Sequence, residues 1–162
     1  ALERKPRPST SVVIVLGPFM PQALRHEFQN RAAAVGGVHM ITFNANMELL
    51  VERAAGVVAM GGYNTFCEIL SLDKPALLIP RSTPRMEQTL RARRAQALGY
   101  VPMLSGDGDR SPDAMAAALR KLERQPLPSA AGAQEILSGL DVICRQTQAL
   151  LSKPTLRQHG ST

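Results

Sequence analysis

Residues Gly56–Tyr100 read GVVAMGGYNTFCEILSLDKPALLIPRSTPRMEQTLRARRAQALGY, and this stretch decides the fold. A short apolar run ends in two glycines and is followed by a helix-forming segment. A second apolar run then leads into a Pro-rich polar loop. Short apolar runs bounded by Gly and Pro are typical of strands buried on both faces. The order strand–helix–strand–helix therefore predicts parallel strands, with the loops after them at one edge of a sheet.

The same alternation continues on both sides of this stretch. We expect strands at 12–16, 38–43, 57–60, 76–79 and 101–104. We expect helices at 22–34, 46–54, 64–72, 83–98, 111–122 and 133–151, and three of them have good first residues: Asn46, Thr83 before Pro84, and Ser111 before Pro112. The prediction is an α/β fold, a Rossmann-like parallel sheet with helices on both faces.

Of the 162 residues, we assign 11–152 to this domain, 1–10 to a polar interdomain lead-in and 153–162 to a flexible tail. The chain begins with Ala, so we expect a piece of a longer protein. The helix at 133–151 carries an apolar stripe that needs a partner: Ile136, Leu137, Leu140, Ile143, Cys144 and Leu151.

The charge balance is basic, with 19 Lys+Arg against 13 Asp+Glu and a net charge of +6. Arginines gather at 81, 85, 91, 93 and 94. Such a cluster attracts anions, or it forms a solvated helix face. We interpret Arg91, Arg93 and Arg94 as the solvated face, and we keep Arg81 and Arg85 as candidates for ligand contact.

The sequence lacks the residues that several classes of function require. Aromatic residues make up 4% of the chain, which disfavours a stacking platform for single-stranded nucleic acid. There is no apolar run near 18 residues, no Ser-His-Asp order and no Cys/His set for zinc. The loop at Gly17 has one glycine where a dinucleotide fingerprint needs three. Asp107 and Asp109 are better explained by a Gly-Asp turn than by a metal loop.

The two cysteines, Cys67 and Cys144, fall in expected helices without metal-ligand spacing. They predict reduced, buried thiols in a cytoplasmic protein.

The segment from Gly61 to Glu68 is the best candidate for binding chemistry. Two glycines let a ligand approach the backbone, and the helix start offers free N–H groups to a pyrophosphate. Asn64 and Thr65 add donors, and the Glu68 carboxylate suits a ribose diol. The competing interpretation is a capping box, in which Thr65 and Glu68 only satisfy the helix end.

Glu87 and Gln88 open the following helix. Paired Glu and Gln side chains suit sugar hydroxyls. An acid in the first turn also complements the helix dipole without any ligand.

With these motifs in view, the chain resembles the carboxyl-terminal, donor-binding domain of GT-B glycosyltransferases, in particular the MurG-like family 28. The similarity covers roughly Val38–Leu122, through ITFNANMELLVERA, VVAMGGYNTFCEI, KPALLIP and the loop ending in EQ. The Gln-Gln pair of the family is only partly matched by Glu87-Gln88, and its glycine-rich first loop is here Gly17-Pro18-Phe19-Met20.

The resemblance implies a role for each matching position. Phosphate would lie near Gly17, and the nucleobase at Phe43 and Asn44 with Met47 beneath. The diphosphate would be held by Gly61, Gly62, Asn64 and Thr65, the ribose by Glu68, and the donor sugar by Glu87 and Gln88. In addition to what the resemblance implies, we expect Arg81 or Arg85 to help stabilise the diphosphate.

The resemblance also implies the chain's chemistry and partners. It implies no cofactor and no metal, a UDP-sugar or other NDP-sugar donor, and transfer of a hexosyl group to an unknown acceptor. The catalytic base would lie in a missing N-terminal acceptor domain. The full protein would be cytoplasmic, with peripheral association at the inner membrane face and no nucleic acid partner. A non-catalytic scaffold module and a nucleotide-sugar epimerase remain the alternatives.

Overall fold

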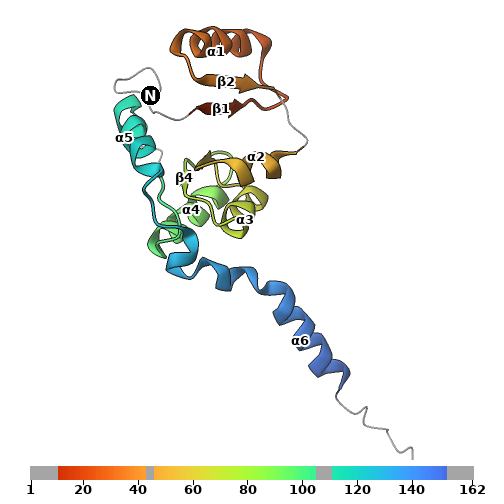
Figure 1. The fold of residues 1–162 in the computed structure, drawn as a ribbon. Helices are drawn as coiled ribbons and strands as arrows, with labels where there is room; N and C mark the ends of the chain where they lie inside the picture. The colour runs from red at the N-terminus through yellow and green to blue at the C-terminus, as the bar shows by residue number, and fades with distance from the viewer. Residues whose placement is uncertain (1–10, 43–45, 105–110, 153–162) are drawn as a thin grey trace, which may run out of the picture.

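The computed structural model describes residues 11–42, 46–104 and 111–152, and Figure 1 shows its elements in order. The strands are β1 (Val12–Val15), β2 (Val38–Ile41), β3 (Val57–Ala59) and β4 (Ala76–Leu78). The α-helices are α1 (Gln22–Val35), α2 (Met47–Arg53), α3 (Tyr63–Ser71), α4 (Glu87–Ala97), α5 (Pro112–Leu122) and α6 (Gly139–Leu151). Two 3-10 turns, η1 (Pro128–Ala131) and η2 (Ala133–Leu137), precede α6.

The parallel α/β architecture is confirmed, but the described strands form two sheets instead of one. β1 pairs with β2 and β3 with β4, both in parallel. Each pair is one β-α-β unit whose connecting helix is α1 or α3, and no ladder joins the two units in the described ranges. The side chains of Val13 and Val15 consequently remain 50% and 37% exposed.

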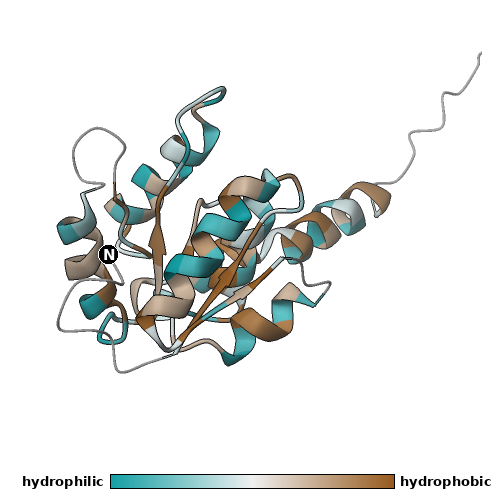
Figure 2. Ribbon diagram, turned by 90° about the horizontal axis from the view of Figure 1, so that it is seen from above, coloured by the Kyte–Doolittle hydropathy of each residue, from teal (hydrophilic) through white to brown (hydrophobic). Residues whose placement is uncertain are grey.

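The core lies in the second unit, where apolar strands run between helices with polar outer faces (Figure 2). β4 is buried along its whole length, and Ile69 and Leu70 of α3 are fully buried beside it. α5 closes the other side: a Cβ added to Gly56 would lie 2.7 Å from Leu122 Cγ. This position before β3 therefore requires a glycine.

Two predicted boundaries are wrong. The strand expected at 101–104 is reduced to a single parallel bridge between Leu78 and Met103. The helix expected from Thr83 begins at Glu87, because Gln88 Oε1 accepts the Arg81 N–H at 3.1 Å and closes residues 81–86 into a loop. By contrast, Ser111 caps α5 as predicted, since its Oγ accepts the Ala114 N–H at 3.1 Å.

The segment expected as one helix at 133–151 is divided at Ser138. η2 docks on α3, where Gln134 Nε2 donates to the Leu70 carbonyl at 3.2 Å. Beyond the break, α6 extends away from the rest of the molecule (Figure 1), and none of its residues is buried. Cys144 on α6 is therefore exposed, contrary to the prediction of a buried thiol, while Cys67 is half-buried; both are free.

Candidate functional site

The turn between β3 and α3 is built on Gly61. Gly61 is buried and has φ +75°, a conformation that side chains disfavour. A Cβ at this position would also lie 3.4 Å from Leu78 Cδ2 on the neighbouring strand. Glycine thus allows the backbone to turn sharply at the carboxyl end of β3, directly into the helix.

The amino terminus of α3 carries no side-chain cap. The helix begins at Tyr63, so Gly62 occupies the N-cap position, and the first helical hydrogen bond runs from Phe66 N–H to Gly62 O at 2.9 Å. The capping-box interpretation is therefore wrong: Thr65 and Glu68 lie inside the helix. The N–H groups of the first turn are left for a ligand, at the positive end of the helix dipole.

Glu68 lies one turn further along the same side of α3. Residues three and four apart on a helix share a face, which places Glu68 behind Asn64 and Thr65. The Cα–Cβ bond of a helical residue is tilted toward the amino terminus, so the side chain of Glu68 leaves α3 on the side of its uncapped end. Glu68 is half-buried, whereas Asn64 is exposed.

The loop after β4 is the neighbour of this turn, because β3 and β4 are adjacent parallel strands. Gln88 is half-buried, and its Oε1 is used by the loop itself through the Arg81 N–H. Glu87 Oε1 lies 3.8 Å from Arg85 Nη1, in an ion pair whose side chains are mostly exposed. The structure thus brings the loop carrying Arg81 and Arg85 beside the Gly61 turn.

Two residues that were not predicted as site residues, Arg91 and Tyr63, join these loops. Arg91 was assigned to a solvated face, but it is half-buried, and its Nη1 donates to the Gly61 carbonyl at 2.8 Å. Its guanidinium carbon lies 5.6 Å from the centroid of the Tyr63 ring. Arg93 and Arg94 are exposed, as predicted. The spacing along α4 could have indicated this position of Arg91. Residues 88, 91, 92 and 95 recur at helical spacing and form one stripe that faces inward.

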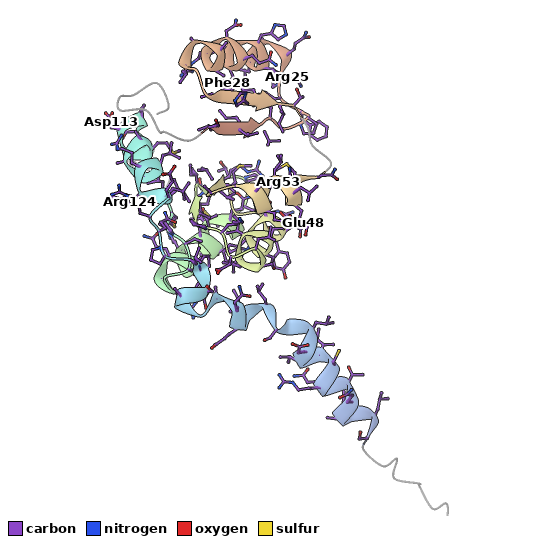
Figure 3. The ribbon with its side chains drawn as sticks, in the orientation of Figure 1. Arg25, Phe28, Glu48, Arg53, Asp113 and Arg124 are labelled. Carbon is purple, nitrogen blue, oxygen red and sulfur yellow. The ribbon has the colours of Figure 1, made fainter. Side chains whose placement is uncertain are left out.

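The remaining site residues lie apart from this cluster or outside the description. Gly17 follows β1 in the other sheet, and its carbonyl accepts the Met20 N–H at 3.2 Å. Arg25 of α1 holds this loop as well, donating to the Met20 carbonyl at 3.1 Å; Figure 3 labels Arg25. Phe43 and Asn44 lie outside the described residues.

Met47 is the first residue of α2, which packs against α3. Lys74, in the turn after α3, links the two helices because its Nζ donates to the Glu52 carbonyl of α2. Met47 is exposed although it is apolar, and Val51 is the buried residue of α2.

The described residues contain no cluster of three or more His, Cys, Asp or Glu side chains arranged for a metal ion. Asp107 and Asp109 fall outside the description. Among the described helices, none has both the length and the apolar character needed to cross a bilayer.

Comparison with protein families gives a match to the model described as "Glycosyltransferase family 28 C-terminal domain", over residues 1–144. Two curated relatives carry the same name, "UDP-N-acetylglucosamine--N-acetylmuramyl-(pentapeptide) pyrophosphoryl-undecaprenol N-acetylglucosamine transferase". The one from Lachnospira eligens is 41% identical over 89 residues, which is 54% of this chain and 25% of the relative. The one from Geobacillus kaustophilus is 32% identical over 114 residues, 66% of this chain and 32% of the relative.

Solved structures with the same arrangement are also glycosyltransferases. The spinosyn forosaminyltransferase SpnP has a TM-score of 0.58 at 16% identity, over 91% of this chain and 45% of that one. The glycosyltransferase VinC, solved in complex with dTDP, has a TM-score of 0.54 at 22% identity, over 80% of this chain and 37% of that one. At these identities the likeness concerns the fold. The chain spans less than half the length of each of these four proteins.

Proposed function

The chain belongs to the glycosyltransferase family 28 C-terminal domain, and from this premise we propose that it binds the nucleotide-diphosphate sugar donor of a glycosyltransferase. The observation that carries the proposal is the uncapped start of α3. It follows the buried Gly61 turn directly and has a carboxylate one turn behind it.

The diphosphate would bind at the start of α3. Backbone N–H groups and the helix dipole favour an anion there without a cationic side chain. In sugar transfer the nucleoside diphosphate is the leaving group, and its negative charge grows as the glycosidic bond breaks. Fixed donors at this position would stabilise that charge, with Arg81 or Arg85 of the adjacent loop adding to the field.

The ribose would bind at Glu68. A carboxylate accepts hydrogen bonds from both hydroxyls of a diol, and a half-buried carboxylate makes stronger hydrogen bonds than one in open solvent. We propose that the nucleotide is UDP, because the names of the two curated relatives specify a UDP-sugar as the donor. The base would lie over Met47, with Phe43 and Asn44 beside it.

The donor sugar would lie toward the loop after β4. Gln88 uses its Oε1 for the Arg81 N–H, and its amide hydrogens would donate to sugar hydroxyls. Glu87 would exchange its exposed partner Arg85 for a further hydroxyl, at little cost because surface ion pairs contribute little. A Glu in this place changes the contacts to the sugar, so we assign a hexosyl group without naming it.

We propose that a second domain supplies the acceptor site and the catalytic base, and that the chain alone binds donor without transferring it. The exposed apolar stripe of α6 would pack against that domain. The names of the curated relatives specify a lipid-linked acceptor, pyrophosphoryl-undecaprenol. For the complete protein we accordingly propose a cytoplasmic location with peripheral attachment to the inner membrane face.

Titration calorimetry with UDP and 2′-deoxy-UDP tests the ribose assignment. The wild-type chain should prefer UDP, and Glu68→Ala should bind UDP about tenfold more weakly, since a hydrogen bond to a charged group is worth about 1.5–3 kcal/mol. The substitution should weaken the binding of 2′-deoxy-UDP less than that of UDP, because only the bond to the 3′-hydroxyl is lost there, so the preference for UDP disappears. Glu52→Ala, at an exposed acid on α2, is the control. Unchanged UDP affinity in Glu68→Ala would show that the ribose binds elsewhere.

A thermal-shift series of nucleotides and nucleotide sugars separates the proposal from its main alternative. Stabilisation by UDP or a UDP-sugar supports donor binding. No shift with any of them would favour a non-catalytic module that has kept the fold.

A further inference from the structure

Arg91 contacts two residues of the β3–α3 turn. Its Nη1 donates to the Gly61 carbonyl at 2.8 Å, and its guanidinium carbon lies 5.6 Å from the centroid of the Tyr63 ring. Tyr63 is 68% exposed, so the arginine and not the core holds this ring. The guanidinium therefore connects α4 to the last residue before the N-cap of α3 and to the first residue of the helix.

The carbonyl that Arg91 binds belongs to the peptide group whose N–H is that of Gly62. In a planar trans peptide the C=O and N–H bonds point in opposite directions. Fixing the Gly61 oxygen toward α4 therefore fixes the Gly62 N–H on the side away from α4. This N–H is one of the donors without a helical partner at the start of α3.

This peptide needs a restraint because glycines flank it on both sides. Glycine populates positive and negative φ about equally, so the peptide between Gly61 and Gly62 has an accessible flipped orientation. Neither glycine has a side chain to limit this flip, and even a Cβ added to Gly62 would meet no atom within 4 Å. Packing therefore leaves the orientation of the Gly62 N–H to be decided by a specific hydrogen bond.

We propose that Arg91 is a positioning residue for the donor diphosphate. It holds the Gly61–Gly62 peptide in the orientation that presents the Gly62 N–H to the phosphate oxygens. The inference rests on the proposed function, since it assumes that a diphosphate binds at the start of α3. In this role Arg91 acts in the ligand-free protein, before the diphosphate binds.

Arg91 also links the two loops of the candidate site. Gln88, one turn earlier on α4, accepts the Arg81 N–H, and Arg91 reaches the Gly61 carbonyl. One side of a single helix thus fixes the loop after β4 and the turn after β3. A shift of α4 would disturb both loops together.

The test compares Arg91→Met with Arg93→Met, an exposed arginine of the same helix that loses the same charge. Each variant is titrated with UDP and with uridine, which lacks the diphosphate. Arg91→Met should bind UDP about tenfold more weakly, the effect of one charged hydrogen bond, with unchanged uridine affinity. Arg93→Met should bind both ligands as the wild type does.

The Gly62 amide signal in ¹H–¹⁵N NMR spectra of the ligand-free proteins distinguishes positioning from direct contact between Arg91 and phosphate. Arg91→Met should shift or broaden this signal, and Arg93→Met should leave it in place. Tyr63→Leu retains the charge of Arg91 but removes its aromatic partner, so it should also weaken UDP binding. Tyr63→Phe keeps the aromatic ring and should bind UDP as the wild type does.

An unchanged Gly62 signal in Arg91→Met would overturn the positioning role. An unchanged ratio of UDP to uridine affinity would overturn it as well, with the donor proposal intact. If the wild-type protein binds neither UDP nor any UDP-sugar, the proposed function fails, and the assignment of Arg91 fails with it.

Discussion

The two glycines of the β3–α3 turn have different physical requirements. Gly61 combines φ +75° with a close neighbour, Leu78, so both its backbone and its surroundings exclude a side chain. Gly62 has φ −54° and ψ 155°, values open to any residue, and nothing lies within 4 Å of its Cβ position. The fold therefore needs Gly61, while the absence of a side chain at Gly62 leaves the start of α3 uncapped.

Gly62→Ser should separate stability from binding. A serine N-cap accepts a hydrogen bond from the first turn and reduces the entropy of the unfolded chain, so the free energy of unfolding should rise by about 1 kcal/mol. The same hydroxyl competes with phosphate for the N–H groups, and UDP should bind several-fold more weakly. Urea denaturation and calorimetry measure the two effects.

Gly61→Ala is the matched comparison for this prediction. Alanine at φ +75° costs about 1–2 kcal/mol, and its Cβ would press on Leu78. Both stability and UDP affinity should fall. If Gly62→Ser were to bind UDP more tightly than the wild type, the start of α3 would not be the phosphate site.

Among the elements, α3 is fixed by the segment that follows α5. Asp73, just after α3, has φ 50°, and its carboxylate accepts from Ser129 N–H at 2.8 Å and from Ser129 Oγ at 2.6 Å. Gln134 adds a bond to the Leu70 carbonyl, and Ala133 is fully buried in the core. The C-terminal segment up to η2 thus holds the end of α3 that lies opposite the candidate site.

Asp73→Ala should lower the free energy of unfolding by about 2 kcal/mol. It removes both acceptors of Ser129 and places alanine in the left-handed region, which costs about 1–2 kcal/mol by itself. Asp73→Asn tolerates that conformation and keeps one acceptor, so it should lose less than Asp73→Ala. Urea denaturation provides the comparison; no loss of stability in Asp73→Asn would mean that the charged contact with Ser129 contributes nothing.

At the scale of the whole molecule, α6 stands apart from the core. The helix extends away from the other elements with side chains all around it (Figure 3), and Leu140, Ile143 and Leu151 are 72%, 60% and 81% exposed. A helix that buries nothing against its own chain contributes little to stability, because most helix stability comes from packing.

Ending the chain at Ser138 should therefore leave its stability and UDP affinity unchanged. The thermal midpoint should move by less than about 2 °C, since 1 kcal/mol corresponds to about 2–4 °C in a domain of this size. Ending the chain at Leu127 is the control, and it should destabilise the protein strongly because it removes Ser129 and Ala133. A large loss on ending at Ser138 would show that α6 packs on this domain.

The sequence alone determined the features that depend on neighbouring residues. The alternation of apolar runs and helices predicted the parallel α/β fold, and the Gly-Gly turn predicted where a helix starts after β3. Local chemistry also identified Ser111 as the cap of α5. Each of these depends on the conformations of a few consecutive residues, which composition and spacing reveal.

Only the tertiary structure decided features that depend on distant residues. In the sequence, Arg91 looks like one of several surface arginines. Its hydrogen-bond acceptor, the Gly61 carbonyl, is 30 residues away in the chain and lies beside it only in the folded structure. The capping box was a sound local alternative for Thr65 and Glu68, and it failed because α3 begins at Tyr63. The division into two sheets and the exposure of α6 likewise follow from which surfaces meet. Periodicity shows that a face is apolar, but the partner that covers it is set by packing across the whole chain.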